Sequence, residues 1–382
     1  MIYLDNAATS FPKPARVITE QMHCMRSYCG NAGRGSHALA LAAAEKIYEC
    51  RAALSDLFGA AGAERIVFSM NTTTALNTVI KGVLKRGDHV LISDMEHNAV
   101  LRPVVKLAEK GEITYTVFPT FPTLPDRTDR QILASILERI RPNTRLLIAA
   151  HASNICSATL PIEAIGRLCR ERGVLFCVDA AQSAGHFPID VERMQIDFLC
   201  APGHKGLMGP QGVGILVLGK DAVCDTLIEG GSGYHSRDSS MPDDPPERYE
   251  AGTLPLPSIA GLLEGIRELQ RHGTDAIYAH ECELCRRLAA RLSKIEGITL
   301  YAPHLPGSIL LFSSERIPSE KLGQQLNTLG FCVRAGLHCA PLAHQTLGTP
   351  ADGAVRVSPS FLNTAAQIDA FADAVESLLR LS

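Results

Sequence analysis

The sequence predicts an α/β fold, with a mostly parallel central sheet flanked by helices and a smaller α+β domain at the C-terminal end. Short runs rich in β-branched residues alternate with amphipathic helical runs from about residue 62 to 220. Most of the strand-like runs are apolar throughout, as expected for a parallel sheet that is buried on both faces. The repeated strand–helix–strand order favours an open sheet with right-handed crossovers.

The first part of the chain supplies the strands of this sheet. Strands are expected at 65–69, 89–93, 113–119, 144–151, 174–181, 198–203 and 212–219. Helical stretches at 75–87 and 161–173 each end in basic residues and Gly, which is typical of a helix C-terminus. Ligands in open α/β sheets bind at the carboxyl ends of the strands, so polar residues at those ends are the candidates for a site.

The composition changes near residues 230–257, which are rich in Gly, Pro, Ser and charge and predict a long ordered loop. Beyond it, a helical run at 258–296 and a strand-like run at 309–314 begin a further α+β pattern. We therefore expect an N-terminal segment near the active site at 1–14, a large ligand-binding domain at 15–256 and a small C-terminal domain at 257–382.

Composition and charge exclude several classes of protein. The 382 residues include 37 Lys and Arg against 40 Asp and Glu, a net charge of −3, which leaves no basic surface for nucleic acid or an anionic membrane. No apolar run approaches the roughly 18 residues of a membrane helix, and the N-terminus lacks the pattern of a secretory signal. We expect a cytoplasmic protein without nucleic-acid or membrane partners, whose 12 cysteines are reduced.

Two polar residues end consecutive strands of the predicted sheet. Asp179 ends the run at 174–181, and Lys205 follows the next strand in a Gly-rich turn. Taken alone, Asp179 would most often cap a helix or pair with a cation, and Lys205 would be a solvated loop residue. Together they match a site for pyridoxal phosphate, in which the Lys forms a Schiff base and the Asp pairs with the ring nitrogen.

Other parts of such a site are found at neighbouring strand ends. Thr72 and Thr73 lie between a strand and a helix, where backbone N–H groups would favour the cofactor's phosphate, although an ordinary helix cap would have the same sequence. His97 follows the strand at 89–93 and is a flat partner for the cofactor ring. Each signal is weak alone, and their joint order along the chain is much stronger.

These residues fall within motifs that resemble the class V aminotransferase superfamily of fold type I pyridoxal phosphate enzymes. The resemblance is greatest to the branch of cysteine desulfurases and selenocysteine lyases, and it spans nearly the whole chain in the family's order. The matching segments are YLDNAATS (3–10), RGSHALA (34–40), NTTTALN (71–77), EHNAVL (96–101), SN (153–154), VDAAQSAG (178–185), APGHKGLMGPQGVG (201–214), YEAGT (249–253), RAGLHCAP (334–341) and VRVSPSFLNT (355–364).

The resemblance implies a cofactor site and a substrate site. The cofactor site would consist of Lys205 for the Schiff base, Asp179 for the ring nitrogen, His97 stacked on the ring and relaying protons, Gln182 for the phenolic oxygen, Asn154 for the ring substituents, Thr72, Thr73 and His204 for the phosphate, and Thr253 reaching in from the second subunit of a homodimer. The substrate site would consist of Arg356, whose guanidinium suits a carboxylate, with Asn6 and Arg334 nearby.

Among the residues of the resemblance, Cys339 is the one that indicates which reaction the protein catalyses. It lies in a Gly-bearing loop between Arg334 and Arg356, next to His338. A thiol near cations has a larger thiolate fraction, which a nucleophile needs, whereas most of the other cysteines resemble small buried hydrophobes. The implied activity is a cysteine desulfurase that converts L-cysteine to L-alanine and leaves a persulfide on Cys339 for an acceptor protein.

Other functions stay open at this stage. The same residues would serve a selenocysteine lyase, for which the Cys339 thiolate need not be essential. Transamination is less favoured because it leaves Cys339 without a role, and the intact Lys205, Asp179, His97 and Arg356 argue against an inactive sulfur-assembly scaffold.

Some positions depart from the family's pattern. Leu337 stands where relatives often have His, Pro202 replaces a Ser that often binds the phosphate, and the turn after Lys205 is one residue longer than usual. No metal site is expected, since the Cys pair at 282–285 lies in a helical pattern without a second pair.

Overall fold

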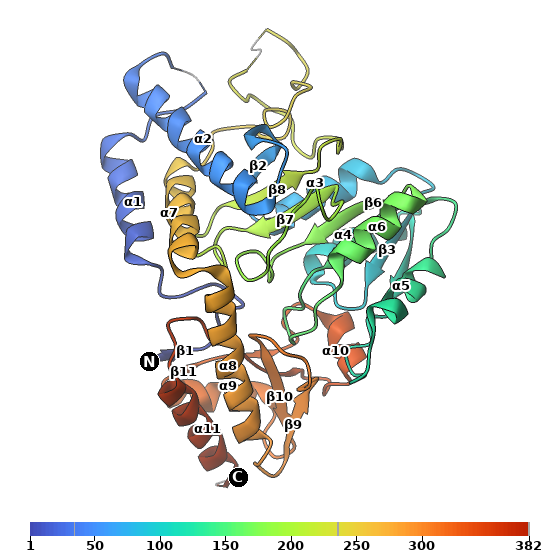
Figure 1. The fold of residues 1–382 in the computed structure, drawn as a ribbon, viewed down its shortest axis with the longest axis vertical. Coiled ribbons are helices and arrows are strands. Elements are labelled where there is room, and N and C mark those ends of the chain that lie inside the picture. The colour runs from blue at the N-terminus through green and yellow to red at the C-terminus, as the bar shows by residue number, and fades with distance from the viewer. Residues whose placement is uncertain (34, 235–236, 381–382) are drawn as a thin grey trace.

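The structure of the protein, a computed structural model, describes residues 1–33, 35–234 and 237–380. Arg34, the first residue of the motif at 34–40, and residues 235–236 of the predicted loop lie outside the described residues. Figure 1 shows a larger part built around a central sheet and a smaller part below it, with helix α8 (Thr274–Leu292) running from one to the other.

The central sheet consists, in the described residues, of seven strands in the order β2-β8-β7-β6-β5-β3-β4. Their bounds are β2 Ile66–Ser69, β3 His89–Ser93, β4 Thr114–Phe118, β5 Thr144–Ala150, β6 Leu175–Asp179, β7 Phe198–Pro202 and β8 Gly214–Leu218. β8 pairs antiparallel with β2 and β7, and the other pairs are parallel. The predicted α/β class with a mostly parallel sheet is therefore confirmed.

The alternation of side chains along the strands divides the core between two faces of the sheet. Val90 and Ile92 pack with α3 and α4, whereas Leu91 lies in the cluster formed with α2, α5, α6 and α7. The helix bounds are α2 Ala38–Phe58, α3 Thr72–Val83, α4 Asn98–Glu109, α5 Asp129–Leu137, α6 Ile162–Arg172 and α7 Leu256–His272. Helices on both faces leave the carboxyl ends of the parallel strands as the open edge.

The smaller part contains a four-stranded antiparallel sheet in the order β12-β13-β10-β9. Its strands are β9 Ile298–Tyr301, β10 Leu310–Ser314, β12 Arg334–Gly336 and β13 Ala354–Val357. The helices that accompany it are α8, α9 Ser319–Thr328, α10 Pro341–Leu347 and α11 Ala365–Arg380. The predicted helical run at 258–296 is two helices, α7 and α8, because the chain turns at Gly273 with φ 79°.

The N-terminal end of the chain contacts both parts. Strand β1 (Ile2–Tyr3) pairs with β11 (Phe331–Cys332), so the N-terminus lies beside the smaller part in Figure 1. The chain then crosses to α1 (Ala15–Ser27), which packs against α7. Within the described ranges, no helix is both long and apolar enough to span a bilayer.

Candidate active site

A cavity of about 240 Å³ opens at the ends of β5, β6 and β7, between the two parts of the chain. It brings together residues from many separate sequence motifs, most of them predicted for the site: Thr72, Thr73, His97, Asn154, Asp179, Gln182, His204, Lys205, Arg334 and Arg356. The ends of these strands and the smaller part meet at this cavity. Ionisable side chains that are hundreds of residues apart in the sequence therefore lie around the same space.

Lys205 and Asp179 share this cavity, and burial shifts both of their pKa values. Burial, with help from the neighbouring Arg356 and Arg334, lowers the pKa of Lys205 to about 8, while Asp179 opposes the shift. Burial raises the pKa of Asp179, opposed by the Ala181 N–H, which donates to Oδ1 at 2.9 Å, and by Lys205. Lys205 is thus partly neutral near pH 7, the form in which an amine acts as a nucleophile.

His97 lies at the start of α4, where its ring acts as the helix cap. Its Nδ1 accepts a hydrogen bond of 3.0 Å from the backbone N–H of Ala99. Burial, and then the positive charges of Lys205 and Arg334, lower the pKa of His97 to about 4. The ring is therefore neutral near pH 7 and carries its proton on Nε2.

The start of α3 lines the cavity. Asn71 caps the helix by accepting a hydrogen bond of 2.9 Å from the Thr74 N–H. Thr72, the first helical residue, has a buried Oγ1 without a hydrogen-bond partner in the described structure. Gly214 packs against this cap so closely that a Cβ there would lie 2.4 Å from the Asn71 carbonyl carbon. Free N–H groups and an unpartnered hydroxyl at a helix N-terminus suit a phosphate.

Residues of the N-terminal segment donate several hydrogen bonds to the carbonyl oxygen of His204, the residue before Lys205. It accepts hydrogen bonds from the Ser10 N–H at 3.1 Å, the Ser10 hydroxyl at 3.2 Å, the Thr9 hydroxyl at 3.1 Å and the Lys13 ammonium at 2.7 Å. Burial lowers the pKa of Lys13 to about 8. Sequence reasoning missed this role of Lys13, although the residue lies only three positions after the end of the motif at 3–10.

The turn after Lys205 is closed by hydrogen bonds from the Met208 N–H to the Lys205 carbonyl and from the Gly209 N–H to the Gly203 carbonyl, both 2.8 Å. Met208, within this turn, has φ 58° and so adopts a left-handed conformation.

Arg356, on β13, is only 2% exposed and is held from two sides. Its Nη2 donates to Asp5 Oδ1 at 2.6 Å, and its Nη1 donates to the Asn154 carbonyl at 2.8 Å. Its Nε is buried and has no partner in the described structure. Burial lowers the pKa of Arg356, and Asp5 opposes this. Asp5 was missed as a site residue, and its only sequence signal is a carboxylate directly after the apolar start of the chain.

Cys339 lies in a tight turn tied to the wall of the cavity. His338 and Cys339 have φ values of 50° and 56°, and the Ala340 N–H donates to the Leu337 carbonyl at 2.9 Å, as in a type I′ turn. The Asn98 N–H donates to the Cys339 carbonyl at 2.7 Å, and Asn154 Nδ2 donates to the His338 carbonyl at 2.8 Å. These bonds hold a left-handed backbone that non-glycine residues adopt only at a cost in free energy.

The His338 ring is only 4% exposed and has partners of its own. Its Nε2 donates to the Arg334 carbonyl and its Nδ1 lies 3.2 Å from His344 Nε2. Burial, and then Arg356, lower the pKa of His338 to about 3. This ring is therefore neutral and occupied with structural contacts, and the neighbouring Leu337 is 44% exposed.

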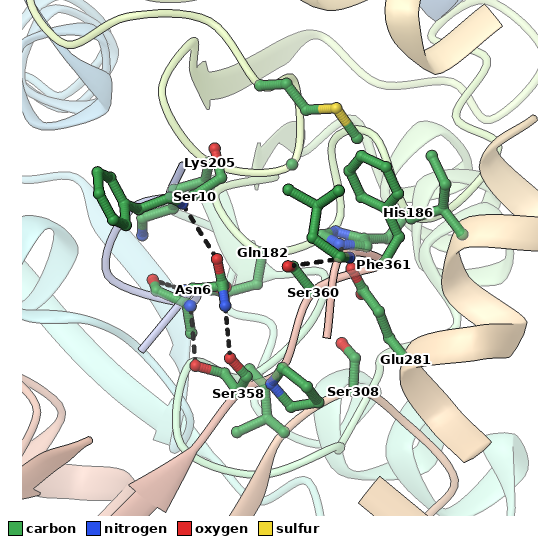
Figure 2. Close-up of a pocket in the computed structure, with 18 of the residues that line it drawn as sticks. Asn6, Ser10, Gln182, His186, Lys205, Glu281, Ser308, Ser358, Ser360 and Phe361 are labelled. Atoms are coloured by element: carbon green, nitrogen blue, oxygen red, sulfur yellow. Dashed lines mark hydrogen bonds and ion pairs between the residues drawn. The ribbon is translucent and has the colours of Figure 1, made fainter. Parts of the chain in front are cut away.

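Three predicted residues do not line the cavity. Cys339 is half-buried at its edge, as described above. Asn6 lines a second, smaller cavity of about 40 Å³ that Lys205 also lines (Figure 2), where its Nδ2 donates to the Ser358 carbonyl at 3.0 Å. Thr253 is exposed, and Asn31 Nδ2 lies 3.5 Å from its Oγ1.

A further buried acid, Glu96, lies behind the cavity and was also missed. It is 0% exposed, its Oε1 accepts from the Ala150 N–H at 2.8 Å, and its Oε2 has no partner in the described structure. Burial raises the pKa of Glu96 to about 8, and the nearby Asp179 adds to this. Glu96 is thus mostly protonated near pH 7.

The residues present fit pyridoxal phosphate. The unpartnered Thr72 hydroxyl at the N-terminus of α3 suits the phosphate, the buried Asp179 suits a cationic ring nitrogen, and the partly neutral Lys205 suits a Schiff base. Across the described ranges, no group of three or more His, Cys, Asp and Glu side chains is placed to hold a metal ion.

Comparison with known proteins agrees with this arrangement. The family model "Aminotransferase class-V" matches residues 2–371. A probable cysteine desulfurase of Methanothermobacter thermautotrophicus is 32% identical, over 99% of this chain and 94% of that protein. Among solved structures, a cysteine desulfurase from Thermococcus onnurineus superposes with a TM-score of 0.88 at 30% identity, over 100% of this chain and 95% of that one. A cysteine desulfurase from Escherichia coli gives a TM-score of 0.87 at 27% identity, over 99% and 94%. The chain belongs to the class V aminotransferase family of fold type I.

Proposed function

We propose that the protein is a pyridoxal phosphate-dependent cysteine desulfurase, which converts L-cysteine to L-alanine and leaves the sulfur as a persulfide on Cys339. The main support for this proposal is that hydrogen bonds connect the Cys339 turn to the wall of the cofactor cavity. Asn154, which lines the cavity, donates to the carbonyl of the residue before Cys339 and accepts from Arg356 through its own carbonyl. A cysteine held in this way has a role that transamination does not supply.

The chain's own residues would hold the cofactor at both ends. Thr72, Thr73 and His204 would bind the phosphate, and the Asp179 carboxylate would bind the ring nitrogen. Gln182 Nε2 donates one hydrogen to the Ala7 carbonyl at 3.0 Å and has a second for the phenolic oxygen. When bound, pyridoxal phosphate supplies an electron sink for the bonds at the substrate's Cα and Cβ.

Other residues would position the substrate and move its protons. Arg356 would bind the substrate carboxylate, with Arg334 as a second cation in the cavity wall. Lys205 is the amine that can take and return the Cα proton, since it is partly neutral near pH 7. His97 would stack on the ring and present Nε2–H, because Ala99 occupies its Nδ1.

The sulfur transfer balances without an external oxidant. The Cys339 thiolate attacks the substrate sulfur, the Cβ–S bond breaks, and protonation of the Cβ position completes L-alanine. Cys339 then carries the S–SH group, whose outer sulfur a thiol of an acceptor protein can take.

Thr253 supports a homodimer as the active form. It is exposed and does not line the cavity of its own chain. The role in phosphate binding that the family resemblance implies for it would therefore be filled from a second chain. On this proposal, the small domain at 257–382 carries both the nucleophile and the carboxylate-binding Arg356.

Release of L-alanine from L-cysteine and from L-selenocysteine, with a reductant, tests the proposal. Cys339→Ser should abolish the reaction with cysteine, whereas the matched control Cys282→Ser, a half-buried cysteine on α8, should react like the wild type. Without reductant, mass spectrometry should find one additional sulfur atom on the peptide of Cys339. Turnover of selenocysteine alone, unaffected by Cys339→Ser, would show that the protein is a selenocysteine lyase instead.

A further inference from the structure

The N-terminal segment forms a strap over the site, from Asp5 in contact with the smaller part to Lys13 in contact with the larger part. Its backbone is fixed by the Asn6 N–H, which donates to the Ser358 carbonyl at 3.1 Å, and by the Ala7 N–H, which donates to Ser358 Oγ at 2.9 Å. Figure 2 shows Asn6 beside Ser358, with Gln182 next to it and Lys205 above them near Ser10. The strap thus places the Asp5 side chain on a rigid backbone beside the cavity.

Asp5 already accepts a hydrogen bond from Arg356, the residue that would bind the carboxylate of the substrate. Its Oδ1 accepts from Arg356 Nη2 at 2.6 Å, while Arg356 Nη1 is taken by the Asn154 carbonyl. Nε is buried without a partner in the described structure, and the whole residue is 2% exposed. Two of the five guanidinium N–H groups are thus taken, and Asp5 is the charged group with which a substrate carboxylate would compete for Arg356.

The two neighbours differ in their freedom to move. The Asn154 carbonyl is part of the backbone, and the same residue's amide anchors the Cys339 turn. The Asp5 side chain is 19% exposed, so it can rotate toward water while the following Asn6 and Ala7 N–H groups stay bound to Ser358. Departure of Asp5 would free Nη2, the position next to the unpartnered Nε. A carboxylate on both nitrogens would form the bidentate pair that guanidinium favours.

We infer that Asp5 is a resident counter-ion of Arg356, which the carboxylate of the substrate replaces on binding. This rests on the proposed function, in which Arg356 binds that carboxylate. In the free enzyme, Asp5 neutralises the buried Arg356 guanidinium, whose burial without a counter-ion would destabilise the fold. In the complex, the substrate takes over this role and satisfies Nε as well. Asp5 therefore selects for ligands that bring a carboxylate, since only these can compensate for its departure.

Equilibrium titration of the holoenzyme, followed by the cofactor's absorbance, tests the inference with L-alanine and ethylamine, which differ by the carboxylate alone. Asp5→Asn keeps the shape of the side chain and removes the competing charge, so L-alanine should bind about tenfold more tightly. Ethylamine should bind as it does to the wild type. Asp5→Glu keeps the charge and should leave the affinity for L-alanine near that of the wild type. Asp369→Asn, which breaks an Asp–Arg pair in the smaller part away from the cavity, is the matched control and should change neither affinity.

Each outcome separates the inference from the function on which it rests. If L-alanine does not perturb the wild-type spectrum, both the proposed substrate class and the inference are wrong. If L-alanine binds the wild type but binds Asp5→Asn equally or more weakly, Asp5 only positions Arg356 and the inference alone is overturned. Crystal structures of the wild-type holoenzyme with and without L-alanine give a test that needs no variant. Asp5 should leave Nη2 in the complex, and its persistence there would refute the exchange.

Discussion

Replacing Asp179 by Asn should lower the pKa of the Lys205 amine in the apo protein. In the wild type, burial reduces this pKa from 10.5 to about 8, and Asp179 is the main group that opposes the reduction. At pH 7 about 9% of an amine with pKa 8 is neutral, against about 0.03% at pKa 10.5, a gain of roughly 300-fold in the reactive form. Removing a neighbouring charge that is worth about a factor of ten in acidity would raise the neutral fraction a further fivefold or so.

Competitive labelling with a trace of acetic anhydride, followed by peptide mapping, measures this pKa. The labelling of Lys205 should rise about tenfold per pH unit up to pH 8 and then level off, while free Nα-acetyl-lysine continues to rise toward pH 10. In Asp179→Asn the plateau should begin at a lower pH. A wild-type labelling curve with its midpoint above pH 10 would refute the conclusion that burial and Asp179 control the pKa of Lys205. A shift of that midpoint to higher pH in Asp179→Asn would refute it as well.

Three further predictions concern binding and stability. Thr72→Val should weaken binding of pyridoxal phosphate by equilibrium dialysis by roughly tenfold, because a hydrogen bond to a charged group is worth about 1.5–3 kcal/mol; Thr78→Val, on the same helix with its hydroxyl bonded to Thr74, should not. Glu250→Gln should reduce the free energy of unfolding in urea by about 3–5 kcal/mol, since Glu250 pairs with the buried Arg51 at 2.6 Å and accepts from the Phe68 N–H. A loss below about 1 kcal/mol would contradict this. Burial lowers the pKa of His151 from 6.5 to about 4, so the folded state binds fewer protons than the unfolded state between these values. Its contribution to stability is present above pH 6.5 and should fall by about 2 kcal/mol between pH 7 and 5. His151→Gln should remove that part of the pH dependence, and an unchanged difference between the unfolding curves at the two pH values would show that His151 does not cause it.

Much of the cofactor site follows from local sequence pattern. Asp179 ends one apolar strand and Lys205 follows the next, and parallel strands bring their carboxyl ends to one edge of the sheet. Thr72 lies between a strand and an amphipathic helix, which places it at a helix N-terminus. Such positions depend on hydrophobic periodicity over short stretches, so composition and spacing alone are sufficient to predict them.

The substrate side of the site depends on contacts that no local pattern encodes. Asp5 and Arg356 are 351 residues apart, and Lys13 reaches the His204 carbonyl across 191 residues. The antiparallel insertion of β8 between β2 and β7 likewise depends on long-range pairing.

Sequence alone therefore determined the fold class, and it predicted the cofactor end of the site and, through the family resemblance, Cys339 as the nucleophile. Tertiary structure decided which groups surround Arg356, that His338 is neutral and occupied with other contacts, and that Asn154 ties the Cys339 turn to the cavity. The physical reason is that burial and charge act through distances in space. Neither the pKa of a side chain nor the partner of a buried donor exists until segments far apart in the chain have packed together.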